Sequence, residues 1–142
     1  MVCPLVGVGN LCVVEATTER ETLADFFGRY GCALTAEDIP GIASCYALPG
    51  MVVSGAHSFT FSSPAAVALS FIGAAPEYRE RGLVAAHAEI DEMTPLGGRL
   101  VLVAVTWTYL DSAGDAVPGE RFRYLVRLSQ PSPQICVVMP VN

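Results

Sequence analysis

Two long runs of β-branched and aromatic residues near the C-terminus constrain the fold most strongly. They span residues 99–110 and 121–130, and the segment between them contains Asp, Gly and Pro. Such runs on either side of turn-forming residues are typical of two long antiparallel strands. In the second run Arg121, Arg123 and Arg127 alternate with apolar residues, which predicts a sheet with one covered face.

The first half of the chain carries helical patterns. Thr18 and Glu21 form a capping box ahead of apolar residues at helical spacing, which predicts a helix over residues 19–34. Thr35 and Asp38 repeat this pattern and predict a second, short helix.

A third helix is predicted to begin at Ser63 and Pro64, because serine is a good N-cap and proline is tolerated at the first helical position. Its apolar positions continue to Tyr78, and Pro76 should kink it or split off its last turn. A small hairpin over residues 51–61 is expected between the second and third helices.

Four strands are expected to complete the domain, over residues 83–94, 99–110, 121–130 and 134–139. The order predicts an α+β fold, with three N-terminal helices packed on a strongly curved antiparallel sheet. At 142 residues the chain is long enough for one domain, which we assign to residues 17–142. Residues 1–16 lack the basic start of a signal peptide, and we interpret them as a loose N-terminal arm or a strand packed on a neighbour.

Charge and cysteine content exclude several classes of function. The formal net charge of −6 provides no basic field for phosphates or anionic lipid, so neither nucleic acid nor membrane is an expected partner. Five cysteines without a C-x-x-C pair indicate free thiols and a cytoplasmic protein. The chain has no dinucleotide, phosphate-loop, serine-hydrolase or zinc-protease motif, and we expect no cofactor and no metal.

Both faces of the strand over residues 99–110 are apolar, with Trp107 and Tyr109 on one of them. The predicted helices cover only one face of the sheet, so the other needs a different cover. The simplest cover is a second copy of the chain, and we expect a homodimer. The arginine row of the next strand has two interpretations: it binds a carboxylate ligand, or it pairs with acids of a neighbouring strand such as Glu89 and Asp91.

Several motifs together resemble the nuclear transport factor 2-like superfamily, which includes SnoaL-like cyclases, ketosteroid isomerases and scytalone dehydratases. They are FFGRYGCALTAED (residues 26–38), IASCY (42–46), Val105-Thr-Trp107 followed by Asp111 and Gly114, and FRYLVR (122–127). The resemblance covers residues 19–139. It implies a cone-shaped, cystatin-like α+β barrel that encloses an apolar pocket, and it specifies fold more than function.

The resemblance also implies positions for three isomerase residues. Tyr30 matches the tyrosine on the first helix, Glu120 matches the acid on a central strand, and the position of the base falls on Ser54. A serine hydroxyl cannot take a proton from carbon without its own activating base. We therefore do not expect isomerase activity.

The leading functional hypothesis is a protein that binds a small hydrophobic or aromatic molecule in the cone. Its predicted ligand-binding residues are Tyr30, Phe26, Phe71, Val105, Trp107 and Glu120. For Tyr30 itself we favour a core role over that of a pocket donor, since most aromatic residues on a helix face belong to the core. The alternatives are a SnoaL- or isomerase-type enzyme that uses Tyr30, His57 or His87 and Glu120 for proton transfer, and a dimeric interaction module.

His87, Glu89 and Asp91 form the densest polar cluster, because alternate residues of a strand share one face. A histidine between carboxylates can bind metal or shuttle a proton. The interpretation we favour is a polar outer face of the sheet. His57 lies in a glycine-containing turn, where a solvated loop residue is expected.

Overall fold

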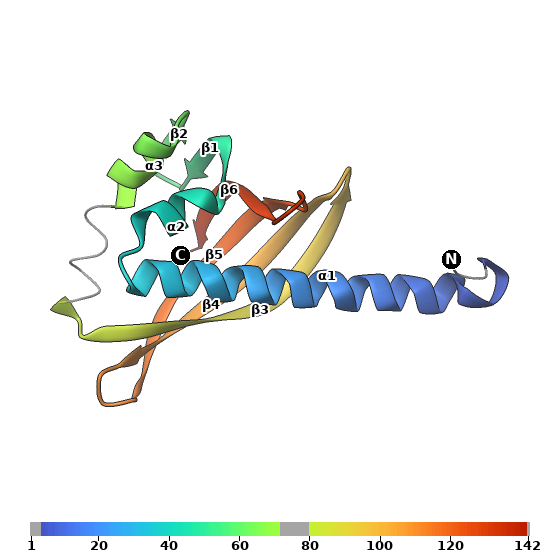
Figure 1. Cartoon of the computed structure of the whole chain (residues 1–142), viewed down its shortest axis with the longest axis horizontal. Coiled ribbons are helices and arrows are strands. Elements are labelled where there is room, and N and C mark those ends of the chain that lie inside the picture. The colour runs from blue at the N-terminus through green and yellow to red at the C-terminus, as the bar shows by residue number, and fades with distance from the viewer. Residues whose placement is uncertain (1–3, 72–79, 142) are drawn as a thin grey trace.

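A computed structural model gives the fold of the chain (Figure 1). It describes the backbone of residues 4–71 and 80–141, and the side chains of residues 18–70 and 80–141. The elements within these residues are, in chain order, α1 (Pro4–Thr35), α2 (Ile39–Ser44), β1 (Tyr46–Val53), β2 (Ser58–Phe61), α3 (Pro64–Phe71), β3 (Leu83–Gly97), β4 (Leu100–Asp111), β5 (Ala116–Arg127) and β6 (Gln134–Val141). The predicted continuation of the third helix through Tyr78, with its kink at Pro76, lies outside the described residues.

The strands form one six-stranded sheet in the order β2-β1-β6-β5-β4-β3. The predicted run of four antiparallel strands is confirmed as β3 to β6. The expectation of a wholly antiparallel sheet is wrong, because β1 pairs with β6 in parallel. The long connection through α3 and four strands, β2 to β5, allows this pairing. A hydrogen bond from the Ile135 amide to the Cys45 carbonyl (2.8 Å) supports its start. The edge strands β2 and β3 do not pair with each other, so the sheet is open and is not a closed barrel.

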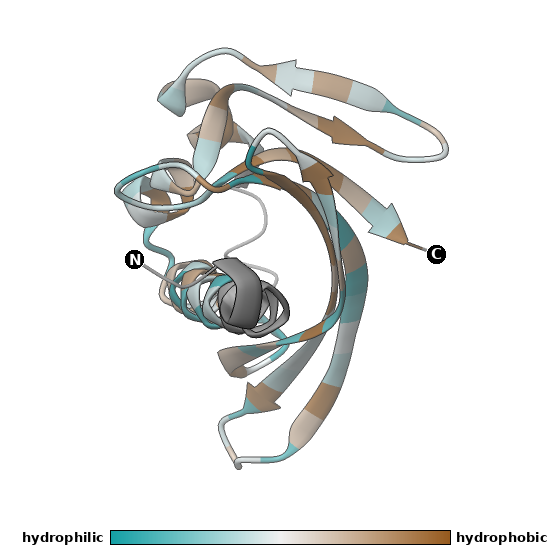
Figure 2. Cartoon of the chain, turned by 90° about the vertical axis from the view of Figure 1, so that its right-hand side faces the viewer, coloured by the Kyte–Doolittle hydropathy of each residue, from teal (hydrophilic) through white to brown (hydrophobic). Residues whose placement is uncertain are grey.

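The curved sheet wraps around α1, which lies along its concave face (Figure 2). Alternate residues of β4 face the helix and are buried: Val101, Val103, Val105, Trp107 and Tyr109. α1 approaches the sheet closely at Gly31, since a Cβ atom there would lie 3.0 Å from the Trp107 ring and 3.1 Å from the Ala86 carbonyl oxygen. The core therefore lies mainly between one face of α1 and the concave face of the sheet.

Two predicted helix starts are wrong. The first helix begins at Pro4, not at Glu19, and its N-terminal part extends beyond the sheet (Figure 1). Residues 4–16 are thus helical, and not the loose arm or strand predicted for them. Proline suits the first position of a helix, which fits a start at Pro4. Thr18 lies inside the helix, where the backbone amides already have helical partners, so a capping box has no function there.

The second helix is capped by Asp38, whose side chain accepts a hydrogen bond from the Gly41 amide (3.1 Å). Thr35 instead donates its hydroxyl to the Gly31 carbonyl at 3.1 Å, inside the last turn of α1. The predicted start of the third helix is confirmed, because Ser63 Oγ accepts from the Ala66 amide at 3.2 Å.

Among the described residues, no helix is both long and apolar enough to cross a membrane. The three cysteines with described side chains, Cys32, Cys45 and Cys136, are free thiols.

Candidate functional site

The interior of the cone is filled by an aromatic cluster made of Phe27, Tyr30, Tyr46, Trp107 and Tyr124. The predicted neighbours Tyr30 and Trp107 meet there, with ring centroids 6.0 Å apart. The Tyr30 and Tyr46 hydroxyls are hydrogen-bonded at 2.6 Å, and Trp107 Nε1 donates to Tyr124 Oη at 2.9 Å. These five side chains are buried. The deep interior is thus occupied by rings whose polar atoms have partners, as buried polar atoms require.

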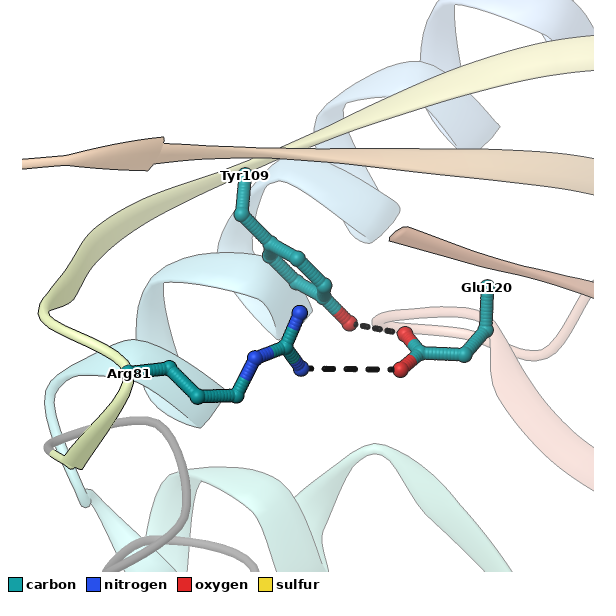
Figure 3. A network of polar contacts seen from close by, with 3 residues as sticks. All are labelled: Arg81, Tyr109 and Glu120. Atoms are coloured by element: carbon teal, nitrogen blue, oxygen red, sulfur yellow. Dashed lines mark hydrogen bonds and ion pairs between the residues drawn. The ribbon is translucent and has the colours of Figure 1, made fainter. Parts of the chain in front are cut away.

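A second group of residues, here called the rim cluster, consists of Tyr109, Glu120 and Arg81 (Figure 3). The Tyr109 hydroxyl donates to one Glu120 carboxylate oxygen at 2.6 Å, and Arg81 Nη1 lies 3.8 Å from the other oxygen. The Arg81 guanidinium lies over the Tyr109 ring, 5.5 Å from its centroid.

The rim cluster spans the boundary between core and solvent. Tyr109 is only 2% exposed, whereas the Glu120 and Arg81 side chains are 51% and 34% exposed. The Glu120 carboxylate and the Arg81 guanidinium therefore lie at the solvent-exposed edge of a buried aromatic ring. This arrangement places two charged hydrogen-bonding groups where the aromatic core meets solvent.

A β-bulge in β5 positions Glu120. Thr106 pairs with Arg121 and Thr108 pairs with Pro118, so two residues of β5 lie opposite Trp107 alone. A bulge of this kind re-aims the side chains beside it, and here it brings Glu120 to Tyr109. Gly119 is the other bulged residue, and a Cβ atom there would lie 2.7 Å from both the Trp107 carbonyl oxygen and Tyr109 Cε2.

The two histidines do not join the site. His87 lies on the outer face of β3, opposite Thr108, while Trp107 faces the interior. His57 is exposed in the turn between β1 and β2, where its amide donates to Ser54 Oγ at 3.0 Å. The structure thus separates His57, His87 and Ser54 from the aromatic cluster, and the enzyme hypothesis retains Tyr30 and Glu120 alone.

The remaining predicted ligand-binding residues are dispersed. Val105 is buried under α1 on the same face as Trp107. Phe26 is buried but lines a groove on the other side of α1, and the Phe71 side chain lies outside the described residues. Sequence reasoning missed Tyr109 and Arg81 as site residues. Tyr109 could have been predicted, because it lies two residues after Trp107 in the same strand and so shares its face. No local sequence pattern identifies Arg81.

The two large cavities formed by described residues lie outside the cone. A groove of about 1070 Å³ runs between α1, α2 and residues 130–134, and a second of about 550 Å³ lies at the other end of that loop. Burial raises the pKa of the Cys45 thiol in the first groove, although the nearby Arg29 guanidinium partly offsets this. The thiol is therefore protonated at neutral pH and is a poor nucleophile.

The polar cluster of β3 lies on the outer face of the sheet. Asp91 Oδ2 accepts a hydrogen bond from Thr106 Oγ1 at 2.5 Å, and His87 and Glu89 are exposed. Within the described part of the chain, no three His, Cys, Asp or Glu side chains are grouped closely enough to hold a metal ion.

An open, curved sheet wrapped around a long helix is the architecture of cystatin-like α+β proteins, and solved structures share it. An NTF2-like protein from Novosphingobium aromaticivorans has a TM-score of 0.65 and 15% identity over 96% of this chain and 90% of its own. An NTF2-like protein of unknown function from Shewanella oneidensis has a TM-score of 0.64 and 13% identity over 87% of this chain and 99% of its own. Aln2 from a Streptomyces species has a TM-score of 0.63 and 14% identity, over 88% of this chain and 91% of its own.

Residues 19–142 match the family described as "NTF2-like protein (DUF6841)", and the chain belongs to this family. The resemblance and the fold class expected from the sequence are thus confirmed. No curated protein matches the chain. At these identities the solved structures support the fold alone, so function has to be argued from the site.

Proposed function

We propose that the protein binds a small aromatic or otherwise apolar molecule that carries one polar group, at the rim cluster of the cone. The observation that supports this most directly is the contrast between Tyr109, which is 2% exposed, and the half-exposed Glu120 carboxylate bonded to it. Ligand sites commonly combine an apolar wall with a few fixed polar groups.

In this proposal Tyr109 becomes the wall when the Arg81 guanidinium, which lies over its ring, moves aside and binds the polar group together with Glu120. The carboxylate accepts a hydrogen bond from a hydroxyl, and the guanidinium donates to a carbonyl or carboxylate. Tyr30, Trp107 and Val105 support the wall from within, since their side chains are at most 3% exposed. The binding role predicted for Glu120 is retained, and that of Tyr30 and Trp107 becomes indirect.

The proposal is tested with 1-naphthol and naphthalene as probes, by quenching of Trp107, the only tryptophan. We expect saturable binding of both, with the hydroxyl of 1-naphthol donating to Glu120. Glu120→Gln should weaken 1-naphthol binding about tenfold, because a charge-assisted hydrogen bond becomes a neutral one. Naphthalene binding should change less than about twofold, since it makes no hydrogen bond.

Glu89→Gln is the matched control, since it removes one exposed carboxylate from the outer face of the sheet. Equal losses for both probes in Glu120→Gln, or no saturable binding of either probe, would contradict the proposal.

An enzyme of the isomerase type is the second candidate, and Ser54 argues against it. The Ser54 hydroxyl accepts from the Ala56 and His57 amides at 3.3 and 3.0 Å, so it organises a turn. We expect no isomerisation of a β,γ-unsaturated 3-ketosteroid above the buffer rate, measured by the absorbance of the conjugated product. Turnover that Ser54→Ala abolishes would show that the matching of the base position is wrong.

A further inference from the structure

The groove of about 550 Å³ carries an acid and a base, and it lies at the far end of β4 from the rim cluster. Glu19 of α1 and Arg99 of the turn between β3 and β4 both line it, and we call it the turn groove. Tyr109 of the rim cluster follows Arg99 by ten residues, which is roughly 30 Å along an extended strand. The turn groove is therefore separate from the rim cluster.

Arg99 has a backbone conformation that is unfavourable for arginine. It is the second residue of the two-residue turn between Gly97 and Leu100, and its φ of 69° lies in the left-handed region that favours glycine. The Leu128 amide donates to the Arg99 carbonyl at 2.8 Å, and Arg99 Nε donates to the Leu128 carbonyl at 2.6 Å. An arginine side chain is thus fixed where glycine would fit better, and strained residues of this kind concentrate at functional sites.

The terminal nitrogens of Arg99 are available to a ligand. Within the described part of the chain they donate no hydrogen bond and make no ion pair. Glu19 is half-buried and also makes no ion pair or side-chain hydrogen bond with any described residue. The two opposite charges line one cavity without contacting each other, so a ligand with complementary charges can pair with both.

The other residues of the turn groove suit a small ligand with an apolar body. Thr18 and Thr22 lie one helical turn apart, and they add hydroxyl groups on the side of α1 that carries Glu19. Leu128 and the buried Pro133 add apolar surface from the other wall. Ligand sites commonly combine apolar walls with a few polar groups that fix the orientation of the ligand.

We propose that the turn groove binds a zwitterion with an apolar side chain, of the kind found in free amino acids and short peptides. The ligand carboxylate accepts hydrogen bonds from Arg99, whose planar guanidinium matches a carboxylate, and the ligand ammonium donates to Glu19. Glu19 repels a simple anion and Arg99 repels a simple cation, so the pair selects a molecule that carries both charges.

Isothermal titration calorimetry with leucine and leucyl-leucine tests the proposal. We expect saturable binding of at least one of these parent ligands, and the tighter one identifies the source as a free amino acid or a peptide. The acetylated form of that parent lacks the ammonium, and the amidated form lacks the carboxylate. Each should bind about tenfold more weakly than the parent, because it loses one charge-assisted hydrogen bond.

Two variants assign each charge to its partner. Arg99→Gln should weaken the parent about tenfold and change the amidated form less than about twofold, because that form has no carboxylate to lose. Glu19→Gln should likewise weaken the parent and spare the acetylated form. Arg121→Gln and Glu21→Gln are the matched controls, since they make the same changes at exposed residues outside the turn groove, and they should leave binding unchanged.

Arg99→Gly separates a binding role from a structural one. Glycine adopts a φ of 69° without strain, so the unfolding temperature should be at least that of the wild type while parent binding falls about tenfold. No saturable binding of either parent, equal affinity for parent and blocked forms, or equal losses of the parent and the amidated form in Arg99→Gln would overturn the proposal. Binding of 1-naphthol should persist in all these variants, so the rim cluster is tested independently.

Discussion

Replacement of Trp107 by alanine is expected to lower the free energy of unfolding by about 3–5 kcal/mol, the usual cost of removing a buried large aromatic side chain. The Trp107 ring is 2% exposed and packs against Phe27 and Tyr30, with centroid distances of 6.5 and 6.0 Å. Its loss leaves a cavity beneath α1 and removes the indole donor to the buried Tyr124 hydroxyl. Against a total stability of about 5–15 kcal/mol, this is a large fraction.

Urea unfolding followed by circular dichroism is the suitable measurement, since the variant has no tryptophan fluorescence. Leu110→Ala is the control on the same strand, because Leu110 is 38% exposed on the outer face and should cost less than about 1 kcal/mol. Trp107→Phe should fall between the two, because it keeps an aromatic ring. A loss below about 1 kcal/mol for Trp107→Ala would mean that the aromatic cluster is not the centre of the core.

The second large effect is expected at the bulge of β5. Gly119→Ala should destabilise the protein by about 1–3 kcal/mol, the usual cost of overpacking. The added methyl group would lie 2.7 Å from the Trp107 carbonyl oxygen, a backbone atom that can move only if β4 moves with it. The bulge should shift, and Glu120 should lose its 2.6 Å contact with Tyr109. We therefore expect weaker 1-naphthol binding together with the loss of stability.

Gly28→Ala is the matched control, because it adds the same methyl group in α1, where no atom lies within 4 Å. Alanine is favoured over glycine in a helix interior, so this change should stabilise the protein by about 0.5–1 kcal/mol. Thermal and urea unfolding of both variants provide the comparison. Equal stability of Gly119→Ala and wild type would show that the bulge relaxes without cost, and unchanged naphthol binding would separate the bulge from the site.

Much of the fold could be predicted because it depends on local patterns. The alternation along β4 correctly assigned Val101, Val105 and Trp107 to one face, and side-chain direction has a fixed period of two in a strand. The capping of α3 by Ser63 was also predictable, since the cap and the amide it satisfies are three residues apart. The start of α1 could not be predicted, because a capping-box spacing is equally compatible with a helix that has already begun.

The candidate site was predicted only in part. The contact between Tyr30 and Trp107 follows from a helix face that opposes a strand face, and the structure brings the rings together. Glu120 was predicted as a ligand-binding residue, but its partners Tyr109 and Arg81 were not. The Tyr109–Glu120 contact depends on a bulge, and bulges leave only weak signals such as a lone glycine within a strand.

The sequence by itself determined most of the secondary structure, the α+β class and the apolar character of both sheet faces, because these follow from the period of neighbouring residues. The tertiary structure alone decided the parallel pairing of β1 with β6, the opening of the sheet, and the placing of His87 away from the aromatic cluster. It also decided that Arg123 of β5 and Glu92 of β3 lie on opposite sides of β4. These features join residues distant in the chain, and their energies arise only when the strands have assembled in one order and register.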